Sequence, residues 1–215
     1  MKKFLLVFFL SLPLQIAPGD ILVNGDFSDG TAHWKGDGKN SGATDHVVMR
    51  AEGTDVAPGL DGMTIPLKPG TWTKIYQVFH THEKSLTFDL TYKVSPEVSF
   101  KQEAVTDVNS TLENVTNISV KDDPTTNGAI SEIPPGNGVL IIVDPAGQKL
   151  TYVFLPIKLG SEESQTITGS IPNLVAHDEK VLYLAFPPGK GDITIVNVAL
   201  HYPSEKQEGS FPKGL

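Results

Sequence analysis

The stretch Ser85-Leu-Thr-Phe-Asp-Leu-Thr-Tyr-Lys-Val94 places an apolar side chain at every second position from Leu86 to Val94. Polar side chains occupy the positions between them. This period of two is typical of an antiparallel strand with one face in a core and one face in water. Similar short stretches lie on both sides of it, separated by Gly, Pro and Asn turns, and they predict further strands at 46–51, 63–67, 71–80, 139–143, 150–155, 164–170, 181–186 and 193–200.

No segment of the chain shows a convincing amphipathic helix pattern. About ten short strands without helices predict an all-β protein, folded as a two-sheet antiparallel β-sandwich. The run Val139-Leu-Ile-Ile-Val143 is apolar throughout, which predicts a strand buried on both faces. It is followed after a short turn by 150–155, so these two strands are expected to form a hairpin.

Composition excludes several classes of function. The 215 residues carry a net charge of −8, and Arg50 is the only arginine. Because nucleic acids and anionic membrane surfaces are bound by Lys and Arg, neither is an expected partner. The chain has no Cys, which excludes disulfides, thiol catalysis and thiolate metal sites. An apolar content of 39% is sufficient for a real core.

The first residues have the pattern of a signal peptide. Lys2 and Lys3 precede the apolar run Phe4–Leu10, which Pro13 interrupts before it is long enough to cross a bilayer. We therefore expect a signal peptide at 1–17, with an uncleaved anchor as the alternative. After cleavage the protein would have no membrane association and would be secreted, periplasmic or at the cell surface.

The remainder is expected to form one sandwich domain over 18–202, followed by a flexible tail at 203–215. Residues 95–137 break the rhythm of strands with prolines and acidic patches, and they are interpreted as an insertion between strands. Weak strands or a ribbon are predicted within it at 98–108 and 112–120. Three Asn-x-Ser/Thr sequons begin there, at Asn109, Asn114 and Asn117, and they have meaning only in a host that glycosylates.

Three short motifs resemble the jelly-roll carbohydrate-binding modules of the galactose-binding-like superfamily. Asn24-Gly-Asp-Phe27 with Trp34 resembles their opening, a Gln-containing strand around Gln77 resembles their middle, and Ile195-Val-Asn-Val-Ala-Leu200 resembles their closing strand. The resemblance implies a jelly roll in which the first and last strands lie side by side. It also implies a non-catalytic module that binds a glycan or polysaccharide.

Modules of this kind often hold a structural calcium ion between the first and last strands. Ser28 and Val196 stand where the family usually has acids, so the ligands would have to be Asp20, Asp26 and Asp29. The alternative is turn chemistry, because Asp side chains in loops accept hydrogen bonds from their own backbone.

Four residues are the candidates for glycan contact. Trp72, Lys74 and Tyr76 share one face of a strand, and the two rings are about 13 Å apart along it, a distance suited to a chain of sugars. Trp34 is the fourth, although a Trp after such an opening usually packs in the core. The alternative for the Trp72 face is that it is buried as well.

His80 and His82, with Glu83, offer imidazole and carboxylate donors for Zn²⁺ or Cu²⁺, although a solvated loop is the favoured interpretation. No Gly-x-Ser-x-Gly, phosphate loop or His-Glu-x-x-His is present, and no enzyme activity is expected. The alternative function is a structural or adhesive surface protein that contacts a protein partner through residues 95–137.

Overall fold

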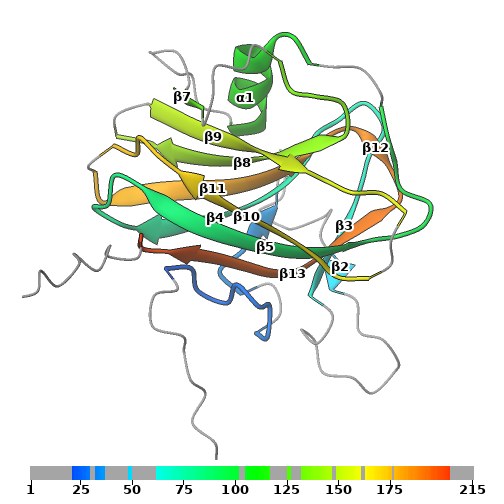
Figure 1. Ribbon diagram of the computed structural model, residues 1–215, viewed down its shortest axis with the longest axis horizontal. Coiled ribbons are helices and arrows are strands. Elements are labelled where there is room, and N and C mark those ends of the chain that lie inside the picture. The colour runs from blue at the N-terminus through cyan, green and yellow to red at the C-terminus, as the bar shows by residue number, and fades with distance from the viewer. Residues whose placement is uncertain are drawn as a thin grey trace, which may run out of the picture.

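The computed structural model describes residues 21–29, 32–36, 48–49, 62–101, 105–116, 125–126, 132–146, 149–160, 163–175 and 177–203. These residues form two sheets packed face to face (Figure 1). The first sheet has the order β1 (Lys35–Gly36), β4 (Thr73–His80), β11 (Glu179–Phe186), β8 (Asn137–Asp144), β9 (Lys149–Pro156) and β7 (Thr125–Thr126). The second has the order β10 (Gln165–Ile171), β5 (Leu86–Val94), β13 (Asp192–His201), β3 (Met63–Pro66) and β2 (Val48–Met49).

Neighbouring strands are antiparallel in both sheets, except that β7 pairs with β9 in parallel. A two-stranded ribbon of β6 (Ser99–Phe100) and β12 (Gly189–Lys190) closes one end of the sandwich. The predicted fold class, an all-β antiparallel sandwich, is confirmed. The predicted hairpin is confirmed too, because β8 and β9 pair from Asn137 with Pro156 to Asp144 with Lys149.

The main core lies between the two sheets. The apolar side chains of β5 alternate into it as the sequence predicts, with Leu86 and Leu90 fully buried and Thr87 exposed. Tyr92 also lies in this core, and its hydroxyl accepts a hydrogen bond from the Lys158 N–H at 3.1 Å. This strand therefore lies in the second sheet with its apolar face toward the main core.

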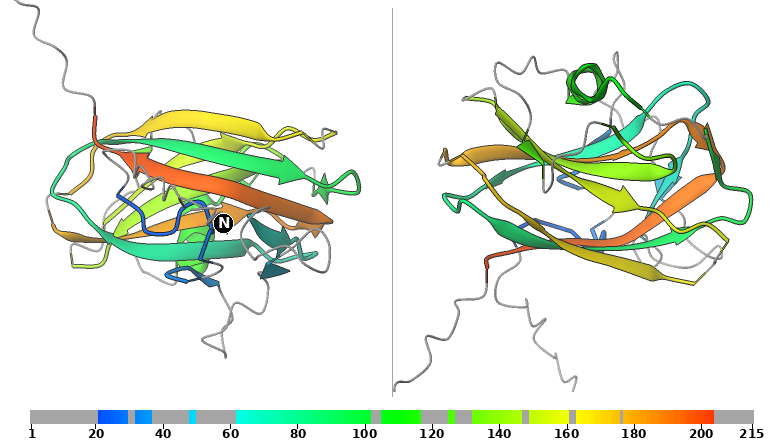
Figure 2. Two further views of the ribbon diagram at one scale, coloured as in Figure 1. Left: turned by 90° about the horizontal axis from the view of Figure 1, so that it is seen from below. Right: turned by 45° about the horizontal axis from the view of Figure 1, so that its top comes forward.

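A second core lies on the outer face of the first sheet. There α1 (Val108–Thr116) covers β8, β9 and β11 (Figure 2), and Val108, Leu112 and Val115 of the helix are buried. Ser99–Phe100 forms a ribbon with β12, as predicted within 98–108. From Val108 to Thr116, however, the prediction of weak strands and of no helix is wrong. The physical reason is that the apolar residues at 108, 112 and 115 recur at helical spacing and find an apolar sheet face to cover.

The two ends of α1 show why a nine-residue helix is stable here. At its start, the Asp107 carboxylate accepts a hydrogen bond from the Ser110 N–H at 3.1 Å, as an N-cap residue does. At its end, the Lys74 Nζ donates to the carbonyl of Val115 and the Tyr183 hydroxyl donates to that of Thr116 at 3.3 Å. The sheet thus provides donors for helix carbonyls that have no partner within the helix.

The opening segment lies beside the last strand, as the resemblance implies. The Ile21 N–H donates to the Leu200 carbonyl at 2.9 Å, and the Val198 N–H donates to the Gly25 carbonyl at 2.8 Å. Residues 21–25 do not form a regular strand, because the chain bends immediately into the turn at Asn24, whose φ is 55°. Gly25 is required, since a Cβ there would lie 2.0 Å from the Val198 carbonyl oxygen.

Several expectations concern residues outside the described ones. The signal peptide at 1–17, the tail beyond residue 203 and the sequon at Asn117 are among them. Within the described ranges, none of the helices has the length and apolar character needed to cross a membrane.

Candidate functional site

A surface pocket lies beside β4, next to the end of β1. Its volume is about 240 Å³. Its lining residues come from three separate segments: Val23, His33, Lys35, Tyr76, Gln77 and Val78. Val23 and Val78 are exposed over 54% and 46% of their surface. An exposed apolar pair thus lies beside an aromatic ring and the side chains of a lysine and a histidine.

Tyr76 is held in place by a second tyrosine. Its ring stacks on Tyr183 of β11, with the ring centroids 5.2 Å apart and the planes inclined by 30°. The register of β11 on β4 sets this contact, because Tyr76 and Tyr183 are direct cross-strand partners. The half-buried Tyr76 ring therefore reaches the pocket in a fixed orientation.

The other walls are fixed by hydrogen bonds and strand pairing. The Gln77 side chain is buried, and its amide binds both backbone groups of Val23, accepting from the N–H at 2.9 Å and donating to the carbonyl at 2.8 Å. Lys35 of β1 is the cross-strand partner of Tyr76. His33 precedes β1 with a φ of 68° and is exposed. Side chains far apart in the sequence thus converge on one small hollow.

Trp72 and Lys74 are placed differently from the sequence-based expectation. Lys74 is only 2% exposed, because the end of α1 covers it and its ammonium group donates a hydrogen bond to the Val115 carbonyl. Trp72 is half-buried and packs against the second core. The expectation of a continuous aromatic platform from Trp72 to Tyr76 is therefore corrected, since the helix covers the position between the two rings.

Trp34 belongs to the main core. It is 4% exposed, its ring lies 5.4 Å from that of Phe27, and its Nε1 donates to the Asn24 carbonyl at 2.9 Å. The candidate role of Trp34 in glycan contact is corrected in favour of the alternative stated with it, because a fully enclosed indole has no face for a ligand.

The proposed calcium ligands are only partly described. Asp26 accepts hydrogen bonds from the Ser28 N–H at 3.1 Å and hydroxyl at 2.9 Å, which is turn chemistry, and Asp29 is exposed. Asp20 lies outside the described residues. Among the residues that the structure describes, no group of three or more His, Asp or Glu side chains is arranged to hold a metal ion. Calcium binding stays a prediction.

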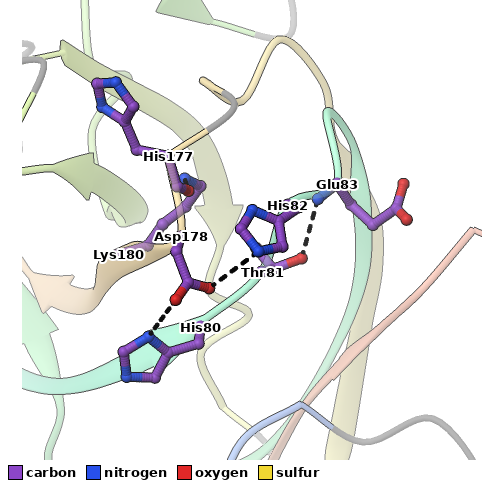
Figure 3. Close-up of polar contacts among 7 residues, drawn as sticks. All are labelled: His80, Thr81, His82, Glu83, His177, Asp178 and Lys180. Carbon is purple, nitrogen blue, oxygen red and sulfur yellow. Dashed lines mark hydrogen bonds and ion pairs between the residues drawn. The ribbon is translucent and has the colours of Figure 1, made fainter.

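The two histidines at the end of β4 face one carboxylate (Figure 3). His80 Nδ1 lies 3.4 Å from Asp178, and His82 Nε2 lies 3.6 Å from the other oxygen of that carboxylate. All three side chains are more than half exposed, and Glu83 points away from them. This arrangement matches the solvated loop that was the favoured interpretation.

A buried lysine lies behind this cluster. The Lys180 side chain is fully enclosed, and its Nζ donates to the His177 carbonyl. Burial lowers the pKa of Lys180, and the nearby carboxylates of Asp144 and Asp178 oppose that shift. His177 in turn lies 2.7 Å from Asp144. These contacts tie the start of β11 to the end of β8, so they serve the fold.

Sequence reasoning found Tyr76 but missed most of the pocket around it. Val23, His33 and Lys35 come from the opening segment and β1, and only the folded chain places them beside β4. Neither their spacing nor their type carries a sequence signal. The one available hint was Gln77, whose side chain connects the opening segment to β4.

No family model matches the chain, and no curated protein matches it. Among solved structures, the chain is similar to the carbohydrate-binding module TmCBM61 solved with β-1,4-galactotriose, with 10% identity over 86% of this chain and 99% of that one and a TM-score of 0.48.

A family 11 carbohydrate-binding module from Clostridium thermocellum, solved with a mixed-linked tetrasaccharide, matches with 10% identity over 85% and 94% of the two chains and a TM-score of 0.43. The enzymatically active domain of tailspike protein 4 from bacteriophage CBA120 matches with 11% identity over 85% and 21% and a TM-score of 0.46. At these values the likeness concerns the fold alone.

Proposed function

We propose that this chain is a non-catalytic glycan-binding protein whose contact site is the pocket at Tyr76. The observation that carries the proposal is the convergence of a fixed tyrosine ring, two exposed valines and two polar side chains on one hollow at the edge of β4. Sugars are bound in this way, because their C–H faces pack on apolar or aromatic surface while their hydroxyls bond to polar groups.

The size of the pocket sets the scale of the ligand. A hollow of about 240 Å³ is smaller than the pockets that enclose drug-sized ligands, and it suits a single sugar ring. His33 and Lys35, both exposed, provide donors at its rim. Because Tyr183 and Gln77 hold the walls before any ligand arrives, binding would need little reordering of side chains.

The lining also supports a role in binding without catalysis. Hydrolysis of a glycosidic bond normally uses two carboxyl groups that flank the bond. None of the six residues that line the pocket is Asp or Glu. None of them is Ser, Thr or Cys either, the hydroxyl and thiol nucleophiles of acyl transfer.

The alternative function is contact with a protein through residues 95–137. The apolar side of α1 is already buried against the sheet, and its outward side carries the polar Asn109, Ser110 and Asn114. Buried apolar anchors usually supply most of the energy of a protein interface, and this side of the helix offers none. Glycan binding at Tyr76 is therefore the better supported function.

The test is the retardation of the purified domain in native gels that contain a panel of soluble neutral polysaccharides. Wild-type protein should be retarded by at least one polymer. Tyr76→Ala should weaken that binding by roughly tenfold, corresponding to about 1.4 kcal/mol of lost ring contact. His33→Ala and Lys35→Ala provide second variants that leave the Tyr76–Tyr183 stack in place.

Tyr202→Ala is the matched control, because Tyr202 is 50% exposed and does not line the pocket. Equal retardation of the wild type and all three pocket variants would refute the site. No retardation by any polymer would refute glycan binding and favour the protein partner. A parallel set of gels with a chelator tests the calcium prediction separately, since loss of retardation there would indicate an ion.

A further inference from the structure

A second pocket, with a volume of about 270 Å³, opens beside the β6–β12 ribbon. Its walls come from the turn before β4 and from the two strands of the ribbon. The apolar part consists of Phe100, Pro69 and Pro188, and the polar part consists of Ser99, Lys101 and Lys190. It shares no lining residue with the Tyr76 pocket, so it is a separate site.

Close backbone packing makes the ribbon rigid at this point. Gly189 is the cross-strand partner of Phe100, and its N–H donates to the Lys68 carbonyl at 3.1 Å. A Cβ at Gly189 would lie 2.5 Å from the Ser99 carbonyl oxygen and 3.4 Å from the Phe100 ring. Only glycine allows this approach, and the Phe100 ring therefore lies directly against the backbone of the opposite strand.

One lysine, Lys190, lies on β12, and the other, Lys101, directly follows β6. Lys190 is the cross-strand partner of Ser99, and the Lys101 N–H donates to the Pro188 carbonyl at 3.0 Å, two positions further along. Both lysines are exposed. Glu97 and Asp192 are close to the ribbon in sequence, but neither lines the pocket. Among the residues that line the pocket, the two lysines are the ones that carry a charge, on a chain whose net charge is −8.

We infer that this pocket binds an acidic saccharide, with the face of one sugar ring against Phe100 and the prolines and its carboxylate at Lys190 and Lys101. The apolar wall selects a ring-shaped ligand, and the two ammonium groups select a negative one. The inference rests on the proposed function for its ligand class, but it concerns different residues and a different charge.

The experiment is calorimetric titration of the full chain with three probes: a galacturonate trisaccharide, the neutral galactotriose and inorganic phosphate. The galacturonate should bind at least tenfold more tightly than either other probe at this site. Its affinity should fall as salt is added, because surface charge pairs are screened.

Lys190→Gln should weaken galacturonate binding by about tenfold, and Phe100→Leu should weaken it without changing the salt dependence. Lys158→Gln is the matched control, since Lys158 is an exposed lysine that does not line the pocket. Tyr76→Ala should leave galacturonate binding unchanged, which separates this inference from the proposed function.

Any of four results would overturn the inference. Absence of galacturonate binding is the first. The second is phosphate binding as tight as that of galacturonate, which would indicate a simple anion site. The third is an unchanged affinity in both Lys190→Gln and Phe100→Leu. If Tyr76→Ala alone abolished galacturonate binding, the acidic sugar would belong to the first pocket and this assignment would fail.

Discussion

Leu112→Ala should release α1 from the sheet before the sandwich unfolds. Leu112 is fully buried in the second core, and truncation of such a leucine costs about 2–5 kcal/mol. The helix has nine residues, below the roughly 12–15 that an isolated helix needs in water. Its stability therefore comes from packing, and the loss falls on the docking of the helix more than on the main core.

The two tryptophans of the chain allow the two cores to be followed separately. Trp34 lies in the main core, whereas Trp72 packs against the second. Tryptophan fluorescence during urea unfolding should therefore show an early step from Trp72 in the Leu112→Ala variant, followed by the main transition from Trp34. Adding Trp72→Phe to that variant removes the early signal and identifies its source.

Asn114→Ala is the control, because Asn114 is an exposed position of the same helix and should change stability by less than about 0.5 kcal/mol. A single transition in Leu112→Ala, at which both tryptophans report together, would refute the reasoning. It would mean that α1 and the sandwich unfold as one cooperative unit.

Two further predictions concern the opening segment and the buried lysine. Gly25→Ala should cost about 1–3 kcal/mol of unfolding free energy, since the new methyl group would meet the Val198 carbonyl at 2.0 Å; a loss below about 0.5 kcal/mol in urea titrations would contradict this. For Lys180, a pKa lowered on folding means that the unfolded chain binds more protons. The free energy of unfolding of the wild type, compared with that of Lys180→Met, should therefore increase as the pH rises toward 10.5, the ordinary pKa of lysine. Urea titrations of both proteins at pH 7 to 10 measure that difference, and a constant difference would show that Lys180 has no such role.

The strands were largely predictable from sequence because their signals are local. The period of two from Leu86 to Val94 became β5, and the apolar run at 139–143 became β8, buried on both faces. The sequence of this run could not show which element packs on the outer face of β8. That element is α1, whose Asn, Ser and Thr residues are weak helix formers and hide the three apolar positions that matter.

The candidate site was predictable only in part for a related reason. Tyr76 lies on a strand that the sequence predicts well, so the face of the strand that it occupies could be assigned. Which part of that face is exposed to solvent depends on where α1 packs. Lys74 shares that face and is buried, whereas Tyr76 is only partly covered. Val23 and Lys35 reach the same hollow through tertiary pairing, which no short sequence pattern encodes.

The pairing of the opening segment with β13 has a mechanical consequence. Ile21 bonds to Leu200 and Gly25 bonds to Val198, so the two ends of the described domain leave from the same end of this antiparallel pair. A force that pulls those ends apart would load the Ile21–Leu200 bond first and the Val198–Gly25 bond only after it breaks. Under tension the opening segment would therefore detach from β13 one hydrogen bond at a time.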